Sequence, residues 1–234
     1  SQRDLRSDGK MKITLLGAES TGKTRLSVDM ARQLVAMGQT VGIVPEVLRE
    51  WCDREGRTPS QAEQSSIARE QARRVITMTA CDVVITDTAP LMTAIYSDWL
   101  FEDRAIHAFA LQHHEIYDVT LVMGLDLPWV ADTHQRDGPQ SQRPVDSLLR
   151  STLELAAIPY STVYGRGHDR CQNALAAASP GIHKSPMAST APNPDRRYTT
   201  MSPGQCDRCS DAVCEKHLFR DLMTQELLQR RCAR

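Results

Sequence analysis

The chain has 234 residues, of which 41% are hydrophobic, and this is enough for one sizeable core and a small appendage. The formal net charge of −1 excludes a global field that would draw the protein to nucleic acid or to an anionic membrane. No apolar run approaches the roughly 20 residues that cross a bilayer, and the polar start lacks the apolar segment of a secretory signal. We expect a cytoplasmic protein with no nucleic-acid or membrane partner.

Short apolar runs and longer helical patterns alternate along most of the chain. The segments 24–38 and 60–80 have apolar residues at three- and four-residue steps, as expected of a helix packed on a sheet. The short runs are rich in β-branched residues and typical of buried strands: residues 12–17, 40–44, 81–86, 118–124 and 160–165. The alternation predicts an α/β domain over residues 11–178, with a five-stranded, mostly parallel sheet and helices on both faces.

The stretch GAESTGKT follows the first expected strand directly. It matches the P-loop pattern G-x-x-x-x-G-K-[ST] between a strand and a helix, the context that this motif requires. The glycines let backbone N–H groups face phosphate oxygens, the lysine can bridge the β- and γ-phosphates, and the threonine can ligate Mg²⁺. A chance match in a glycine-containing turn is the alternative. We therefore expect this segment to bind the triphosphate of ATP or GTP. The residues expected to take part are Gly17, Glu19, Ser20, Thr21, Gly22, Lys23, Thr24 and Arg25.

An acidic residue, Asp87, stands at the end of the third expected strand, followed by Thr88. A carboxylate at the tip of the strand beside a P-loop usually holds magnesium, directly or through water. Alternatively, Asp87 or Thr88 caps the helix expected to begin near Pro90. The two interpretations are compatible.

Glu46 and Arg49 follow the second expected strand. The carboxyl ends of parallel strands line the ligand crevice of such a sheet. A carboxylate there could accept the proton of an attacking hydroxyl, and an arginine could hold polar groups of a substrate. The alternative is a solvated ion pair, three residues apart on a short helix.

Two arginines, Arg136 and Arg143, lie in a polar segment that contains glycine and proline. Such a loop suits a lid that closes over the phosphates and neutralises charge in the transition state. Exposed surface arginines are the alternative. The segment 165–170, GRGHDR, could wrap the nucleotide base or form an ordinary turn between a strand and a helix.

Several of these segments together resemble the NadR-like P-loop kinase family. They are GAESTGKT, VPEVLRE, ITDT, YDVTLVMGLDLPWVAD and QRDGP…RPVDSLLR, and the resemblance covers residues 12 to about 178. It implies a nucleoside-type kinase that uses ATP and Mg²⁺, with nicotinamide riboside as the lead acceptor. By position, the resemblance implies that Lys23 and Thr24 bind the triphosphate and that Asp87 binds the metal or the acceptor hydroxyl. It also implies that Glu46 and Arg49 belong to the acceptor pocket, and Arg136 and Arg143 to the lid.

The sequence departs from this family in three places. Ala89 replaces the second acid of a D-T-D motif, Asp132-Thr133 replaces a D-G pair, and no H-x-G-H segment of an adenylyltransferase is present. Kinase chemistry is therefore a firmer expectation than the identity of the acceptor. A regulatory module that binds nucleotide and hydrolyses ATP slowly or not at all is the competing hypothesis, although such a module has no need of an acceptor-side carboxylate such as Glu46.

The composition changes near residue 179. Residues 179–203 hold five prolines and few apolar residues, which predicts a linker, and residues 204–234 form a Cys-rich tail with a short helix. The spacing C-x2-C-x4-C-x2-H suits a structural zinc site. One alternative is a set of free thiols on a disordered tail, and another is packing of these side chains against the domain without metal. Its ligands would be Cys206, Cys209, Cys214 and His217. The tail could dock on the domain, recruit a partner or join a second copy in a homo-oligomer.

Overall fold

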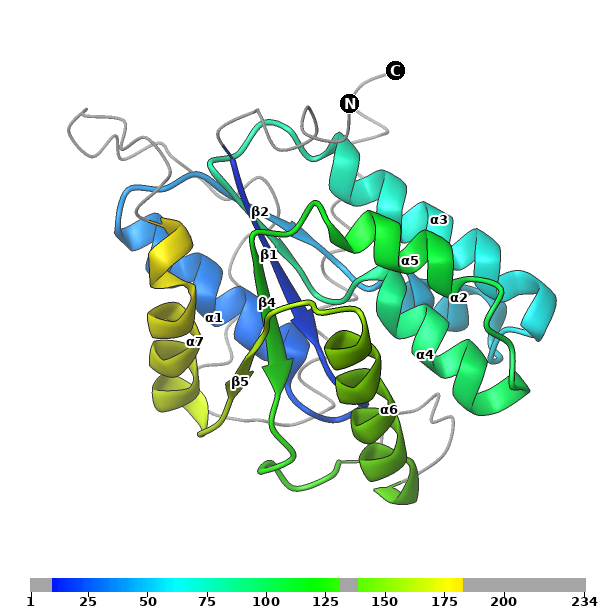
Figure 1. The fold of residues 1–234 in the computed structure, drawn as a ribbon. Coiled ribbons are helices and arrows are strands. Elements are labelled where there is room, and N and C mark those ends of the chain that lie inside the picture. Colours follow the sequence, from blue (N-terminus) through cyan, green and yellow to red (C-terminus); the bar gives the residue numbers. More distant parts are fainter. Residues whose placement is uncertain (1–9, 131–138, 183–234) are drawn as a thin grey trace.

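A computed structural model describes residues 10–130 and 139–182 of the chain. Its centre is a sheet of five parallel strands in the order β2-β3-β1-β4-β5 (Figure 1). The strands are β1 (Met11–Leu16), β2 (Val41–Val44), β3 (Val83–Thr86), β4 (Val119–Met123) and β5 (Ser161–Val163). The predicted fold class is confirmed: four strands lie within the expected runs, and β1, the central P-loop strand, begins one residue earlier than expected.

Seven α-helices cover the sheet within the described residues (Figure 1). α1 and α7 lie on one face, and α3, α4, α5 and α6 on the other. They are α1 (Lys23–Ala36), α2 (Val47–Glu55), α3 (Gln61–Thr77), α4 (Pro90–Phe101), α5 (His107–His114), α6 (Gln142–Leu155) and α7 (Gly167–Ile182). A short 3-10 turn, η2 (Pro139–Ser141), precedes α6.

Local sequence signals place several helix starts. Ser60 and Glu63 form a capping box at the start of α3, which satisfies two backbone N–H groups that the helix itself cannot. Pro90 opens α4 at a position where its missing N–H costs nothing. Ala89 is the N-cap of α4 and no side chain caps it, so the alternative role of Asp87 or Thr88 as the cap does not hold.

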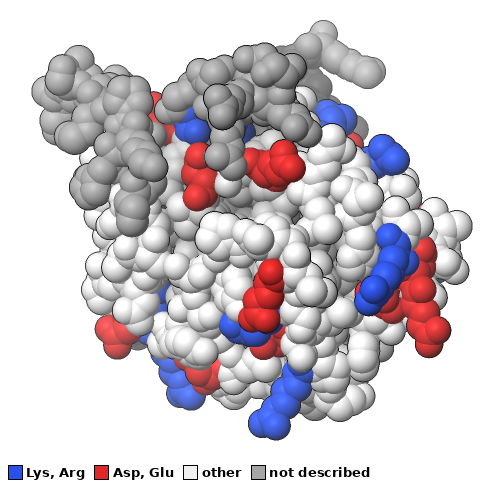
Figure 2. Space-filling model, in the orientation of Figure 1, with Lys and Arg blue, Asp and Glu red and all other residues white. Residues whose placement is uncertain are grey.

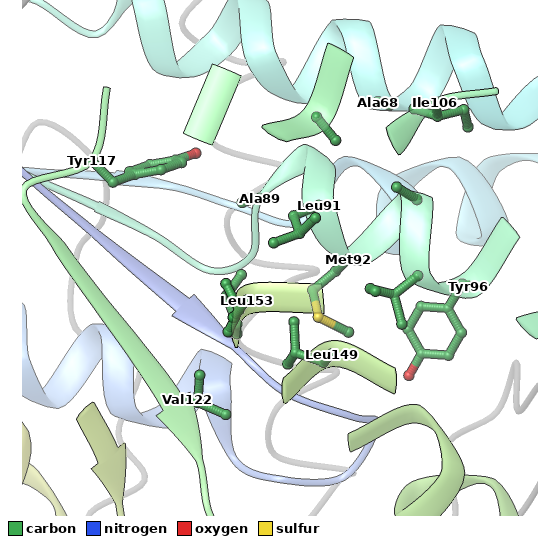
Figure 3. Close-up of a cluster of buried hydrophobic side chains, with 14 of the residues drawn as sticks. Ala68, Ala89, Leu91, Met92, Tyr96, Ile106, Tyr117, Val122, Leu149 and Leu153 are labelled. Carbon is green, nitrogen blue, oxygen red and sulfur yellow. The ribbon is translucent and has the colours of Figure 1, made fainter. Parts of the chain in front are cut away.

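The core consists of two layers, one on each face of the sheet. Alternate residues of β1, such as Ile13 and Leu15, pack against α1 and α7, because side chains along a strand point to opposite faces. On the other face, side chains of α4 and α6 such as Leu91 and Leu149 pack on Val122 of β4 (Figure 3). The two layers hold the carboxyl ends of the strands in fixed relative positions.

α7 ends at Ile182, past the expected domain boundary at residue 178. The helical pattern therefore continues into the first residues of the segment expected to be a linker. On the face shown in Figure 2, lysine and arginine residues are interspersed with aspartate and glutamate. No helix in the described ranges is long and apolar enough to cross a membrane.

Candidate nucleotide site

The P-loop connects β1 to α1 and depends on two glycines. Gly17 has φ +153°, and a Cβ there would lie 2.9 Å from the Cβ of Met123 on β4. Gly22 has φ +76° and is the N-cap of α1. A side chain at either position would meet strain or a clash, so the loop can wrap closely only with glycine at both. Its backbone N–H groups and the N-terminus of α1 thus share one concave turn.

Lys23 begins α1, and its side chain folds back over the P-loop. Its Nζ donates hydrogen bonds to the carbonyl oxygens of Gly17 (2.8 Å) and Ala18 (3.0 Å), and the residue is buried. The ammonium is therefore held at the mouth of the loop, where a terminal phosphate of a nucleotide would lie.

The predicted magnesium residues lie in direct contact. The Oγ1 of Thr24 donates a 2.6 Å hydrogen bond to Oδ2 of Asp87, which stands at the end of β3 with 1% of its surface exposed. The Oδ1 of Asp87 is buried and has no hydrogen-bond partner in the described residues. Carboxylate and hydroxyl oxygens are the ligands that Mg²⁺ prefers, so this pair fits the ion in chemistry and in place.

The pKa of Asp87 is raised to about 7. Burial is the largest cause, followed by the charge of Glu46, and the positive charges of Arg49 and Lys23 only partly offset them. A cation at Oδ1 of Asp87 would stabilise the charged form of the carboxylate.

Thr88, the next residue, has φ +142°, a conformation that residues other than glycine rarely adopt.

Glu46 and Arg49 lie at the end of β2, the neighbour of β3 in the sheet. Glu46 is the N-cap of α2, and its Oε2 lies 3.7 Å from Nε of Arg49. The ion pair expected as the alternative interpretation is therefore present. The charge of Glu46 raises the pKa of Asp87, and the N–H of Asp87 donates a 2.9 Å hydrogen bond to the carbonyl of Val44, two residues before Glu46.

The variable residues of the P-loop contact elements that sequence reasoning did not connect with it. The backbone N–H of Glu19 donates to Oη of Tyr96 on α4 (3.1 Å), and its carbonyl accepts from Nε2 of Gln142 on α6 (2.8 Å). The Oγ of Ser20 accepts from the N–H of Val130 (2.7 Å). These contacts join the loop to α4, to Val130 and to the start of α6.

The remaining assigned residues stabilise the loop and the helix after it. Thr21 donates its hydroxyl hydrogen to the carbonyl of Ala18 (2.7 Å), which closes the turn. Arg25 pairs with Asp29 one turn along α1, with 2.9 Å between Nε and Oδ2. Arg25 thus takes part in an ion pair of α1.

The structure also shows Asp126 and Arg170, which the sequence did not mark as a pair. The guanidinium of Arg170 is buried and donates to Asp126 and to the P-loop carbonyl of Thr21. Burial would raise the pKa of Asp126, but hydrogen bonds from the N–H of Gly165 and from Arg170 hold it below its ordinary value. Because the pair joins residues 44 positions apart, no local pattern could indicate it.

The predicted lid residues are only partly described. Arg143 is exposed in the first turn of α6, so it lies on a helix and not in the expected loop. Arg136 and the Asp132-Thr133 departure lie outside the described residues, as do the four candidate zinc ligands. Within residues 10–130 and 139–182, no group of three or more His, Cys, Asp or Glu residues could hold a metal ion.

A central parallel strand followed by a glycine loop, a buried lysine and a Thr24–Asp87 pair defines a P-loop nucleotide-binding domain. Comparison with protein families identifies an AAA domain over residues 12–170, and the chain belongs to this family. No curated protein sequence matches the chain.

Two solved structures are similar in fold. NadR protein in complex with NAD and AMP-PNP has a TM-score of 0.59 at 16% sequence identity, covering 81% of this chain and 53% of that one. NadR protein in complex with NR has a TM-score of 0.61 at 17% identity, covering 79% and 53% of the two chains. The chain thus spans about half the length of these proteins. The family model thus shows an AAA domain, and the resemblance to NadR is confirmed for the fold.

Proposed function

We propose that this protein is an ATP- and Mg²⁺-dependent kinase that phosphorylates a small hydroxyl-bearing metabolite, with nicotinamide riboside as the lead acceptor. One observation carries the proposal: Asp87 accepts a 2.6 Å hydrogen bond from Thr24 and follows Thr86, which is paired in the sheet with Val44, two residues before Glu46. This proximity supports one site for the phosphate-side and acceptor-side groups. A regulatory module would need only the phosphate side.

Each group has a role in this proposal. Thr24 and Asp87 hold the magnesium ion, which neutralises charge on the phosphates when bound. Lys23 leaves the P-loop carbonyls to pair with the terminal phosphates, and the loop N–H groups bind their oxygens.

The acceptor side of the site performs the proton transfer. The Glu46 carboxylate takes the proton from the acceptor hydroxyl as its oxygen forms a bond to the γ-phosphorus. The bond from that phosphorus to the bridging oxygen breaks, and ADP keeps the electron pair. Arg49, held near Glu46, orients the acceptor. Asp87 is the alternative base, and its contact with Thr24 favours the metal role for it.

The choice of acceptor rests on similarity. The structure of NadR protein in complex with NR has the same fold, and the sequence resemblance covers acceptor-side segments such as 44–50 and 85–88. The shared fold supports a nucleoside-type acceptor, and Ala89, in place of a second acid, is the reason to compare several acceptors.

A product assay tests the proposal. Purified protein is incubated with ATP, Mg²⁺ and a panel of nucleosides and vitamins that includes nicotinamide riboside, and ADP and phosphorylated products are measured by chromatography. We expect one acceptor to yield equal amounts of ADP and monophosphate. Lys23→Ala protein is the control for contaminating kinases. ADP release that no acceptor stimulates would favour the regulatory ATPase module.

For the tail, the proposal remains a structural zinc site at Cys206, Cys209, Cys214 and His217. These ligands could form a closed tetrahedral shell that folds a segment with little apolar surface of its own. Metal analysis of protein purified without chelator should find about one zinc per chain, lost in a Cys206→Ser/Cys209→Ser variant. A zinc content below about a tenth of an equivalent would remove the site from the proposal.

A further inference from the structure

The guanidinium of Arg170 joins three segments that are far apart in the sequence. Its Nη1 donates to Oδ1 of Asp126 (2.9 Å) and to the carbonyl of Gly165 (3.0 Å). Its Nη2 donates to the carbonyl of Thr21 (3.0 Å) and, at 3.4 Å, to that of Gly124. With 4% of its surface exposed, the residue is part of the interior and not of a solvated turn.

The turn after β5 is shaped to bring Arg170 into this position. Gly165 has φ +104°, and a Cβ there would lie 3.3 Å from the backbone nitrogen of Arg170. The N–H of Gly165 donates to the second oxygen of Asp126 (2.7 Å). One carboxylate thus holds both the turn and the guanidinium, and the buried charge of Arg170 has a counter-ion in Asp126 at the surface.

The contact with Thr21 bears on phosphate binding. In a trans peptide the C=O and the following N–H point in opposite directions. A hydrogen bond that holds the Thr21 carbonyl toward Arg170 therefore directs the N–H of Gly22 away from Arg170. That N–H is one of the donors that a phosphate at the start of α1 would use.

We infer that Arg170 is a positioning residue for the P-loop, which orients the Thr21–Gly22 peptide for phosphate and couples the turn after β5 to it. The segment 165–170 therefore acts on the phosphate side through its arginine. The inference rests on the nucleotide-binding part of the proposed function and is independent of the acceptor.

Two variants and one control test the role. Arg170→Lys keeps the charge beside Asp126 but cannot span four acceptors with a planar fork, and Arg170→Gln removes the charge as well. Arg150→Gln is the matched control, because Arg150 pairs with Asp146 (2.8 Å) and with Thr162 (2.9 Å) without a hydrogen bond to the P-loop. Arg170→Lys is the milder change and serves if Arg170→Gln does not fold.

The measurements separate phosphate binding from base binding. Calorimetry in the presence of Mg²⁺ gives the affinity for tripolyphosphate and the affinity for ATP. Hydrogen exchange of peptides that cover residues 17–24 gives the exchange rates of the loop amides without ligand. We expect Arg170→Lys to weaken both ligands about tenfold or more, since small misplacements of a binding group cost this much. Exchange in the loop should become faster, and Arg150→Gln should leave all three measurements near those of the unmodified protein.

Two outcomes would overturn the inference. Unchanged tripolyphosphate affinity with weaker ATP binding would restrict Arg170 to the base side of the site. Unchanged loop exchange with a lower melting temperature would reduce it to a packing role. If the unmodified protein binds neither ligand, the proposed function fails, and loop exchange alone then decides whether Arg170 positions the P-loop.

Discussion

Lys23 lies at the first position of α1, with its Nζ shared between two carbonyl oxygens of the P-loop. Those bonds hold the ammonium where the β- and γ-phosphates would bind. Replacing Lys23 by Ala should lower kcat/KM about a hundredfold or more, because one fixed electrostatic contact in a closed site is typically worth that much. Steady-state kinetics with thermal unfolding checks this. A fall in activity with a matching loss of folded protein would argue against a direct role.

The raised pKa of Asp87 predicts that magnesium binding depends on pH. Its pKa of about 7 arises mainly from burial and then from the charge of Glu46, so the carboxyl is largely protonated below pH 7. The metal needs the charged form, so Mg²⁺-nucleotide affinity should fall about tenfold per pH unit below 7 if one proton is displaced. Calorimetry from pH 6 to pH 8 would show this, and a flat profile would contradict it.

The same shift has a consequence for stability. A carboxyl whose pKa is raised by folding contributes stability at low pH and loses it as pH rises through about 7. Asp87→Asn should therefore bind Mg²⁺-nucleotide poorly but unfold at a higher temperature than the unmodified protein at pH 8. A lower melting temperature there would show that the charged form has partners that the described residues do not reveal.

At the level of elements, α6 connects the lid region to the P-loop. Gln142 at its start bonds to the carbonyl of Glu19, and the adjacent Arg143 is exposed in the same turn. An exposed arginine next to a residue that contacts the P-loop supports the proposed role of Arg143 near a bound nucleotide. The structure thus moves Arg143 from the expected loop to the start of α6.

Arg136→Ala and Arg143→Ala should lower kcat more than they weaken ATP binding, if their contacts form mainly in the transition state. The effect of Arg143 should depend on the attachment of α6, so Gln142→Ala should produce part of it. Arg104→Ala, which removes an exposed partner of Asp98 on α4, is the control and should change neither quantity. An unchanged kcat in both variants would show that Arg136 and Arg143 are exposed surface arginines without a role in the reaction.

For the molecule as a whole, two buried histidines of α5 make stability depend on pH. Burial lowers the pKa of both His113 and His114 to about 4, and His114 also lies 2.9 Å from Oγ1 of Thr120 through its Nε2. The unfolded chain binds protons with a pKa near 6.5, so stability is present above 6.5 and is lost as pH falls toward 4. The predicted loss is up to about 3 kcal/mol for each histidine.

Denaturant unfolding between pH 7 and pH 4.5 would measure this loss, and His113→Phe and His114→Leu should make the profile flatter. Asp87 acts in the opposite direction in the same window, so each variant must be compared with the unmodified protein at each pH. His168→Ala, at an exposed position of α7, is the control. An equal slope in all four proteins would show that other groups control acid unfolding.

Much of the fold could be predicted from the sequence, because its signals are local. Each strand is a short β-branched run, and the P-loop is a contiguous motif whose lysine and threonine need only the strand before it and the helix after it. Parallel order follows from strand–helix alternation. The position of Asp87 at the end of β3 was predictable for the same reason, since the strand that carries it was recognisable.

The sequence by itself determined the α/β class, the P-loop and the carboxylates at the strand ends, since these depend on residues close together in the chain. Only the tertiary structure decided that Thr24 contacts Asp87, that Gln142 contacts Glu19, and that Arg170 reaches the P-loop. These contacts join positions as many as 149 residues apart. Their partners are set by how the two core layers hold the strand ends together, which no local pattern encodes.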